Sequence, residues 1–229
     1  MNTRLSLLLF VFVIIGLSAC NKTDDTVATT LTTKLNLINA SPDTVNFYLN
    51  GTRLSKSNVY PAGSSGYFDV AFGEQNYQVK DIFDPTGSTV RALFSKTLTL
   101  DTGKKYSFFI VDETADNAFL TNDTLQTDTN KNECYVRFVN ASPDAGALDF
   151  AVGDTAKFSN VAFKTASEFK SVGVSSLKPI YLYHTGSSTP ILTGNVNILA
   201  GKSYTFYAKG KLTGTGNSVL SVGTTLNFN

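Results

Sequence analysis

The sequence predicts an all-β protein in which two tandem immunoglobulin-like β-sandwich domains follow a lipoprotein signal peptide. The word NASPD occurs at Asn39–Asp43 and again at Asn140–Asp144, 101 residues further along the chain. Other matched words follow each copy in the same order. Short runs of alternating apolar and polar residues fill both copies, and no convincing helical period follows Cys20.

The first residues read as a targeting segment and not as part of the fold. Arg4 supplies a positive charge, and Leu5–Gly16 is an apolar run of 12 residues. A membrane-spanning helix needs roughly 20 residues, so the run fits a secretory signal peptide over residues 1–19. LSAC, which ends at Cys20, resembles a bacterial lipobox and implies that Cys20 is acylated and becomes the mature N-terminus. The alternative is an ordinary signal peptide with an incidental cysteine.

Residues 20–32 are expected to form the lipidated cysteine and a flexible tether, because they are polar, rich in threonine and without hydrophobic pattern. Asn21 is similar to the residue after the cysteine in lipoproteins sorted to an outer membrane. Asp24 and Asp25 resemble the acidic export signals of surface-displayed lipoproteins, or are simply solvated linker. We therefore expect the membrane, contacted through the N-terminal lipid, as one partner, with the protein facing the periplasm or the cell surface.

The repeated words divide the mature chain into two copies. Besides NASPD, SNV recurs at Ser57–Val59 and Ser159–Val161, and TGKKYSFF at Thr102–Phe109 matches AGKSYTFY at Ala200–Tyr207. Their nearly constant offset indicates a duplicated domain with small loop differences. The predicted division is residues 33–127 for the first repeat, 128–132 for a polar linker and 133–229 for the second repeat. A linker this short predicts that the two repeats touch.

Each copy shows strand periodicity. In Val45–Leu49 apolar residues alternate with polar ones, and Asn50-Gly51 then supplies a pair that tolerates positive φ in a tight hairpin. Gly153-Asp154 occupies the same place in the second copy. About seven strands in about 95 residues favour an immunoglobulin-like sandwich. A small Greek-key barrel is the alternative, since the chain has no tryptophan and lacks the Cys…Trp…Cys pattern.

The paired words resemble a known bacterial family. VRFVNASPDAGALDFAVGD and LNLINASPDTVNFYLNG, each followed later by a Gly-Lys turn that opens an aromatic strand, are similar to the domain of unknown function 4397. The first copy departs from the pattern after Asp43. The resemblance covers both copies. It implies exported, anchored β-sandwich proteins and supplies no catalytic residues.

The residues needed for catalysis or metal binding are scarce. The chain has one histidine, His184, which could act with Ser142 only if their loops meet. Zinc needs three or four converging ligands, and the chain offers one histidine and a spare Cys134, which is expected to be a small buried residue. Asp112–Asn117 is acidic enough for a loop calcium but lacks EF-hand spacing, so a solvated turn is the default. Paired carboxylates could form a glycosidase site, but the pair Asp69 and Glu74 has no acidic match in the second copy. We expect no enzyme, no cofactor and no metal.

NASPD itself is predicted to be a structural turn. Asparagine, aspartate and serine hydrogen-bond nearby backbone, and proline fixes φ. We expect the two aspartates to cap backbone N–H groups of the bend in the same way in both copies. The turn residues are Asn39, Ser41, Pro42 and Asp43, with Asn140, Ser142, Pro143 and Asp144 in the second copy.

Binding is the functional class that remains. With 19 Lys and Arg against 18 Asp and Glu and no basic run, nucleic acid is not an expected partner. We expect a lipid-anchored envelope protein with a structural, adhesive or protein-interaction role. The alternative is a carbohydrate-binding accessory lipoprotein that uses surface tyrosines, although the lack of tryptophan weakens it. The candidate tyrosines are Tyr48, Tyr60, Tyr67, Tyr181 and Tyr183.

Overall fold

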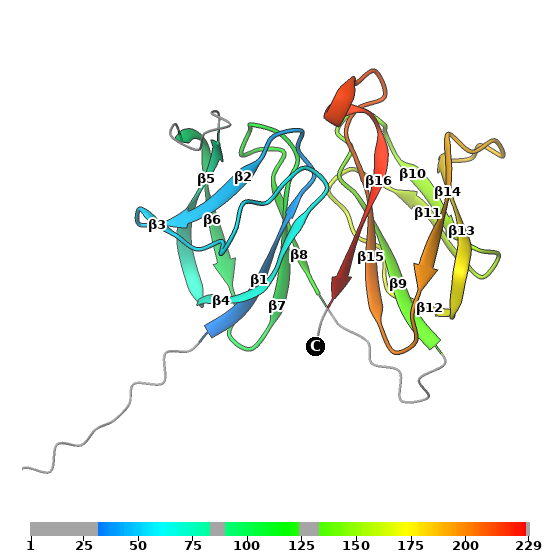
Figure 1. The fold of residues 1–229 in the computed structure, drawn as a ribbon, viewed down its shortest axis with the longest axis horizontal. Helices are drawn as coiled ribbons and strands as arrows, with labels where there is room; N and C mark the ends of the chain where they lie inside the picture. Colours follow the sequence, from blue (N-terminus) through cyan, green and yellow to red (C-terminus); the bar gives the residue numbers. More distant parts are fainter. Residues whose placement is uncertain (1–31, 83–89, 124–132, 228–229) are drawn as a thin grey trace, which may run out of the picture. The chain divides into compact units, whose positions relative to one another are not determined.

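The computed structural model describes residues 32–82, 90–123 and 133–227 (Figure 1). The predicted signal peptide, Cys20 and the linker at 128–132 lie outside these ranges. Residues Leu31–Asn229 form one compact unit. In the described ranges, no helix has the length and apolar character needed to cross a membrane.

Both repeats are built almost entirely from strands. The strands of the first repeat are β1 (Thr32–Asn39), β2 (Val45–Leu49), β3 (Thr52–Arg53), β4 (Ser64–Ala71), β5 (Gly73–Ile82), β6 (Val90–Leu100), β7 (Lys105–Ile110) and β8 (Phe119–Asn122). The strands of the second repeat are β9 (Glu133–Asn140), β10 (Leu148–Val152), β11 (Ala156–Val161), β12 (Lys170–Gly173), β13 (Ser175–His184), β14 (Leu192–Ile198), β15 (Ser203–Lys209) and β16 (Ser221–Asn227). A short 3₁₀ helix, Gly216–Ser218, precedes β16.

The two repeats have the same topology, which confirms the duplicated sandwich. The first contains the sheets β4-β1-β7-β8 and β3-β2-β5-β6. The second contains β12-β9-β15-β16 and β11-β10-β13-β14, the same order shifted by eight strands. The pairs β1–β7 and β9–β15 are parallel, and the other neighbours are antiparallel. Each repeat thus has eight strands in the described residues, one more than the sequence predicts, because the short β3 and its counterpart β11 also pair.

The predicted hairpin turns are present. Asn50 and Gly51 have φ of 50° and 79° between β2 and β3, as a tight hairpin requires. Gly153, in the equivalent turn, has φ of 58°. The turn residues predicted from the sequence therefore form the turn of the equivalent hairpin in both copies.

Each sandwich encloses an aromatic core. In the first repeat the ring of Phe47 stacks on that of Tyr77 with centroids 4.7 Å apart. In the second, Phe138 stacks on Phe150 at 4.6 Å. Cys134 lies fully buried in this second core, and burial raises the pKa of its thiol to about 11. It is therefore a protonated, small core residue, as its place in a strand predicts.

The two sandwiches contact each other through the outer faces of the sheets that contain β1 and β9. Ile38, Phe109 and Phe119 of the first repeat form one buried cluster with Val139 and Tyr207 of the second. The Tyr207 hydroxyl also donates to the carbonyl of Ala62 at 2.9 Å. All residues of strand β15 are consequently buried. One face of the strand packs in the core of the second repeat, and the other face packs against the first repeat. The predicted contact between the repeats is confirmed.

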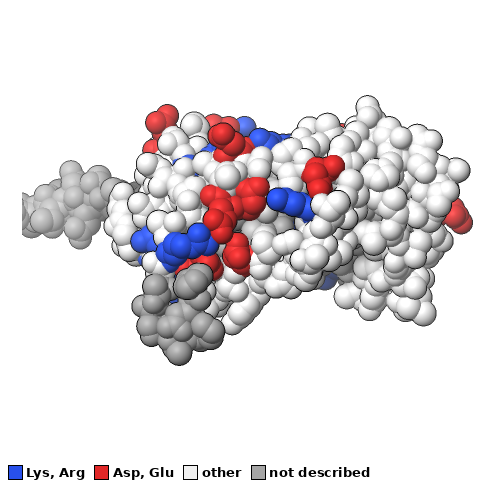
Figure 2. All heavy atoms as spheres, turned by 90° about the horizontal axis from the view of Figure 1, so that it is seen from above, with Lys and Arg blue, Asp and Glu red and all other residues white. Residues whose placement is uncertain are grey.

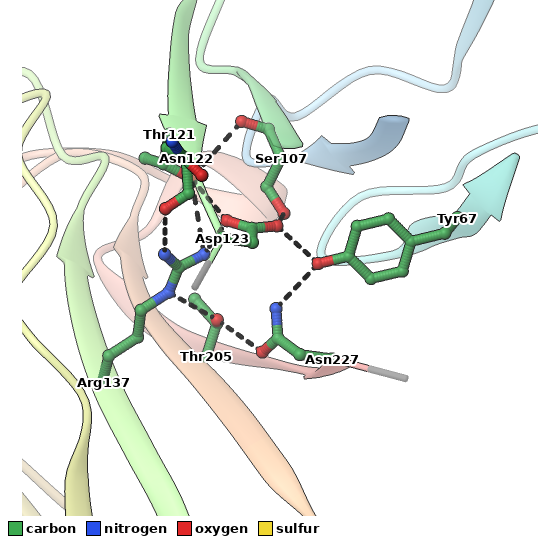
Figure 3. Close-up of polar contacts among 8 residues, drawn as sticks. All are labelled: Tyr67, Ser107, Thr121, Asn122, Asp123, Arg137, Thr205 and Asn227. Carbon is green, nitrogen blue, oxygen red and sulfur yellow. Dashed lines mark hydrogen bonds and ion pairs between the residues drawn. The ribbon is translucent and has the colours of Figure 1, made fainter. Parts of the chain in front are cut away.

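A polar core lies beside this apolar cluster (Figure 3). Arg137 of β9 reaches across the junction and donates to the carboxylate of Asp123, and its Nε donates to Thr205 at 2.9 Å. The other oxygen of Asp123 accepts bonds from Tyr67 at 2.5 Å and Ser107 at 2.7 Å. The side chains of Arg137 and Asp123 are 2% and 0% exposed. This ion pair is therefore enclosed, with hydrogen-bond partners on both sides.

A buried charge is tolerated only when it is paired and hydrogen-bonded. Arg137 also donates to the Asn122 carbonyl at 3.3 Å and to the Thr121 hydroxyl at 3.4 Å. Its guanidinium lies 5.0 Å from the ring centroid of Phe169. Removal of one partner alone would leave the other charge without compensation, so the pair holds the two repeats in one arrangement.

We predict that Asp123→Asn lowers the free energy of unfolding by about 3 kcal/mol, because Arg137 stays buried without its counter-ion. Adding Arg137→Met to that variant should recover part of the loss. Urea unfolding of the single and double variants measures both. Asp69→Asn is the matched control, because Asp69 pairs with Lys34 on an exposed surface and should matter by less than about 1 kcal/mol. Equal losses for Asp69→Asn and Asp123→Asn would contradict the buried-pair account.

Two buried tyrosines give a second prediction. The Tyr77 hydroxyl has no hydrogen-bond partner among the described residues, so Tyr77→Phe should leave stability at pH 7 unchanged or raise it by up to about 1 kcal/mol. Tyr207→Phe should lower it by about 1 kcal/mol through loss of the bond to Ala62.

The same tyrosines predict alkaline destabilisation. Burial raises the pKa of Tyr77 to about 12 and raises that of Tyr207 above its usual range. An unfolded tyrosine titrates near pKa 10, so their contribution is complete below about pH 10 and is lost as pH rises towards the folded pKa. Each phenylalanine variant should therefore lose less stability than the parent between about pH 10 and 12. Denaturant melts across this window test it, and parallel curves for parent and variants would refute it.

Candidate functional site

The NASPD words form the bends between β1 and β2 and between β9 and β10. In each bend the side chain of the asparagine makes hydrogen bonds to the backbone. Asn39 Nδ2 donates to the carbonyls of Asp43 at 2.7 Å and Val59 at 2.8 Å. Its Oδ1 accepts the N–H of Ser41 at 3.0 Å. The side chain is fully buried, so these bonds replace water for every polar atom of the amide.

The second bend repeats this pattern. Asn140 Nδ2 donates to the carbonyls of Gly146 at 2.8 Å and Val161 at 3.0 Å, and its Oδ1 accepts the N–H of Ser142 at 3.1 Å. Val59 and Val161 are the last residues of the two SNV words. The two repeated words therefore act together, because in each copy the asparagine binds the carbonyl of the valine about twenty residues later.

The expected capping role of the aspartates is wrong. Asp144 accepts the N–H of Leu212, at 3.0 and 3.2 Å, from the loop between β15 and β16 and not from its own bend. Burial, followed by repulsion from Asp81 and Glu113, raises the pKa of Asp43. In both copies the asparagine side chain, and not the aspartate, binds the backbone of the bend. Pro42 and Pro143 stand in the two bends beside the aspartates.

The candidate catalytic residues, Ser142 and His184, lie in different environments. The hydroxyl of Ser142 donates to the carbonyl of Gly210 at 2.7 Å. His184 ends β13, where it pairs with Leu148. Within the described residues no hydrogen bond joins the two side chains, so they do not form a paired nucleophile and base.

In the acidic loop 112–117, the side chains of Asp112 and Glu113 are engaged in hydrogen bonds and an ion pair with neighbouring residues. Asp112 accepts the N–H and hydroxyl of Thr114 at 2.8 and 2.7 Å and the amide of Asn117 at 2.5 Å. Glu113 pairs with Arg91 of β6 at 2.7 Å. Within the described ranges, no group of three or more His, Cys, Asp or Glu side chains is placed to hold a metal ion.

A hollow on the outer face of the sheet β11-β10-β13-β14 has a different character. Tyr181 and Tyr183 lie on this face of β13 with ring centroids 6.3 Å apart and planes 34° apart. Beside Tyr183 is a hollow of about 250 Å³ whose polar lining includes Asp149, Lys157 and Ser159. Aromatic rings next to a small set of polar groups are the usual composition of a small-molecule or glycan site.

Asp149 is held in a fixed position in this hollow. Its Oδ1 accepts the N–H of Asn160 at 2.7 Å and the hydroxyl of Thr185 at 2.9 Å, and its Oδ2 accepts the N–H of Gly186 at 3.2 Å. Partial burial alone would raise the pKa of Asp149, but these three donors outweigh it and hold the pKa below its usual value. The carboxylate is therefore a charged acceptor and not a general acid.

The other candidate tyrosines do not share a surface. Tyr67 is part of the buried junction, and Tyr60 is 64% exposed on a loop. Tyr48 lies beneath Lys80, whose Nζ is 4.4 Å from the ring centroid. The prediction from sequence did not include Asp149 as a site residue. Its place between the apolar residues Leu148 and Phe150 of β10 could have indicated that it faces outward.

Three solved structures show weak similarity to this chain. The Bacillus anthracis TIE protein is 11% identical with a TM-score of 0.24, and the chain covers 34% of it, about a third of its length, with 78% of its own. A CBM26-family module of Eubacterium rectale Amy13K, solved with maltoheptaose, is 12% identical with a TM-score of 0.26, with 84% and 96% of the two chains covered. A protein described as a candidate cell adhesion protein of Bacteroides eggerthii is 11% identical, TM-score 0.26, with 86% and 95% covered.

No curated protein matches the sequence. The family model described as "Domain of unknown function (DUF4397)" matches residues 33–151 and 134–225. The second match coincides with the second repeat, and the first covers the first repeat and continues through β9 and into β10. Together they span most of the chain, as the NASPD-containing words predict. The chain therefore belongs to the DUF4397 family.

Proposed function

We propose that this protein is a lipid-anchored, non-catalytic component of the bacterial envelope that binds other molecules through its two-repeat body. The observation that carries the proposal is the way its reactive groups are used. The single histidine lies at the end of a strand, the thiol is buried and the acidic loop holds its own hydrogen bonds, whereas Tyr181 and Tyr183 lie on a half-exposed face beside a polar hollow. Such a body suits adhesion or protein interaction better than turnover.

The anchoring part of the proposal rests on the sequence. The apolar run of 12 residues followed by Ser18-Ala19-Cys20 suits acylation of Cys20, and the polar tether would leave the folded body clear of the membrane. Outer-membrane sorting with the body facing the periplasm or the surface is the location we propose.

Carbohydrate binding is the second candidate function, and the hollow beside Tyr183 favours it. The apolar face of a sugar ring can stack on a tyrosine, while its hydroxyls need donors and acceptors such as Asp149, Lys157 and Ser159. In the first repeat the positions equivalent to Tyr181 and Tyr183 are Gln78 and Lys80, so a glycan site would belong to the second repeat.

We predict that Cys20→Ala releases the protein from the membrane fraction, because several acyl chains are needed for firm anchoring and none would be attached. Fractionation and metabolic labelling with a fatty acid measure this. Ser18→Thr, which keeps the cysteine, is the control and should stay in the membrane. A Cys20→Ala protein that remains wholly in the membrane fraction would rule out the lipid anchor.

We predict that, if the second candidate holds, the full chain in mild detergent binds neutral oligosaccharides on a glycan array. Tyr183→Ala should then weaken binding roughly ten-fold, equivalent to about 1.4 kcal/mol. Tyr48→Ala alters an aromatic on the corresponding sheet of the first repeat and should have no effect. Equal binding by the two variants, or no bound glycan at all, would remove the carbohydrate candidate.

A further inference from the structure

The second repeat has an apolar hollow on one flank, between the edges of its two sheets. It has a volume of about 270 Å³ and is lined mainly by Phe150, Ile180, Leu182, Leu192, Gly194 and Val222. β14 and β16, which border it, are both edge strands. Because Ile180, Leu192 and Val222 pack on the core but are only partly buried, this flank brings the core to the surface.

The first repeat shows what fills the same flank. Tyr77 pairs with Leu49 of β2 as Ile180 pairs with Val152 of β10, so Tyr77 and Ile180 are equivalent. By the same registers, the larger residues of the first repeat and their smaller counterparts are Tyr77 and Ile180, Phe94 and Leu192, Lys96 and Gly194, and Leu120 and Thr224. Two core exchanges run the other way, Leu37 to Phe138 and Ala118 to Val222, and the hollow remains.

The first repeat also bridges this flank with charged side chains. Lys96 of β6 donates to the carbonyl of Ala115 at 2.7 Å, in the loop that joins β7 to β8. Arg91 of β6 pairs with Glu113 of the same loop at 2.7 Å. In the second repeat Gly194 replaces Lys96, so the corresponding bridge cannot form.

Strand β14 lacks the protective features that edge strands usually carry. Its sequence, LTGNVNI, has no charge and no proline, and its outer edge adjoins no other strand in the described residues. Natural edge strands carry lysines, prolines or bulges that prevent pairing with another chain. In the view of Figure 2 the first repeat carries many charged side chains and the second repeat few.

We propose that the flank of the second repeat is a strand-addition site for an extended peptide segment of a partner protein, uncharged and with an aromatic side chain directed into the hollow. The inference rests on the proposed protein-interaction role and names the chemistry of the partner. The peptide backbone pairs with the free edge of β14, and its ring fills the 270 Å³ hollow.

The first repeat also indicates the chemistry of the occupant. There the space is occupied by the ring of Tyr77, stacked at 4.7 Å on Phe47, and Phe47 is equivalent to Phe150, which lines the hollow. An aromatic ring is therefore complementary to it. The lining carries no charged side chain, so a charged residue would be desolvated there without a partner.

A tryptophan-containing peptide tests this directly, because the chain has no tryptophan and the peptide is then the sole source of indole emission. The probe is a synthetic peptide in which valine and threonine alternate around one central tryptophan, with a lysine at each end for solubility. The full chain is held in liposomes of zwitterionic lipid, with empty liposomes as the blank. We expect a saturable blue shift of the indole emission as the ring enters the hollow.

Two variants restore residues of the first repeat. Gly194→Lys restores the charge, and a Cβ at Gly194 would lie 3.5 Å from Ile180, an ordinary contact, so the variant should fold. Ile180→Tyr refills the hollow with a ring. Each should weaken binding of the peptide roughly ten-fold or more, which is about 1.4 kcal/mol. Thr99→Lys places the same charge on the exposed side of β6 in the first repeat and should bind as the parent does.

Thermal unfolding establishes that each variant is folded before binding is compared. Absence of a blue shift with the parent chain, or unchanged binding by both variants, would overturn the proposal. Sedimentation that shows a dimer of the parent, dissociated by Gly194→Lys, would also overturn it, since the occupant would then be a second copy. None of these results depends on the fractionation of Cys20→Ala, so failure here leaves the anchoring proposal to its own test.

Discussion

The structure of this protein depends on the packing of two sheets through faces that would be solvent-exposed in an isolated sandwich. Once the sheets of β1 and β9 are in contact, every polar group between them must find a partner in the protein. Arg137 and Asp123 satisfy this requirement for the most demanding groups, and Thr205, Ser107 and Tyr67 complete their hydrogen bonds. The apolar cluster of Ile38 and Tyr207 continues the same interface, so the two repeats behave as one body.

The two copies differ in charge where the repeats meet. The strand registers make Asn36 the counterpart of Arg137, and Asn227 the counterpart of Asp123. The junction therefore contains one cation from the second repeat and one anion from the first, with a neutral amide in each equivalent place. If the two faces were identical, each repeat would bring both an arginine and an aspartate to the junction. Divergence at these positions fixes which repeat takes which role, since an exchange of one partner leaves a buried charge unpaired.

Much of the fold could be predicted from local pattern, because alternation, hairpin turns and repeated words act within a single copy. Asn50-Gly51 and the NASPD bends are examples in which a few residues determine their own geometry. Arg137 could not be identified in this way. In VRFV it occupies the polar phase of an alternating strand and reads as solvent-facing, and only the second sheet, distant in sequence, buries it. Asp149 was missed because its three donors come from β11 and from the loop after β13, which are distant from it in sequence.

The two repeats provide an internal comparison that a single domain would not offer. A shared backbone with different side chains separates what the fold needs from what one copy has been free to change. Asn39 and Asn140 make the same bonds and belong to the first class. Gly194 belongs to the second, because the first repeat shows that the position accepts a lysine, and a glycine in the interior of a strand weakens it unless another backbone approaches closely. A position that sacrifices strand stability and opens the core at an edge is better explained by an interaction than by folding.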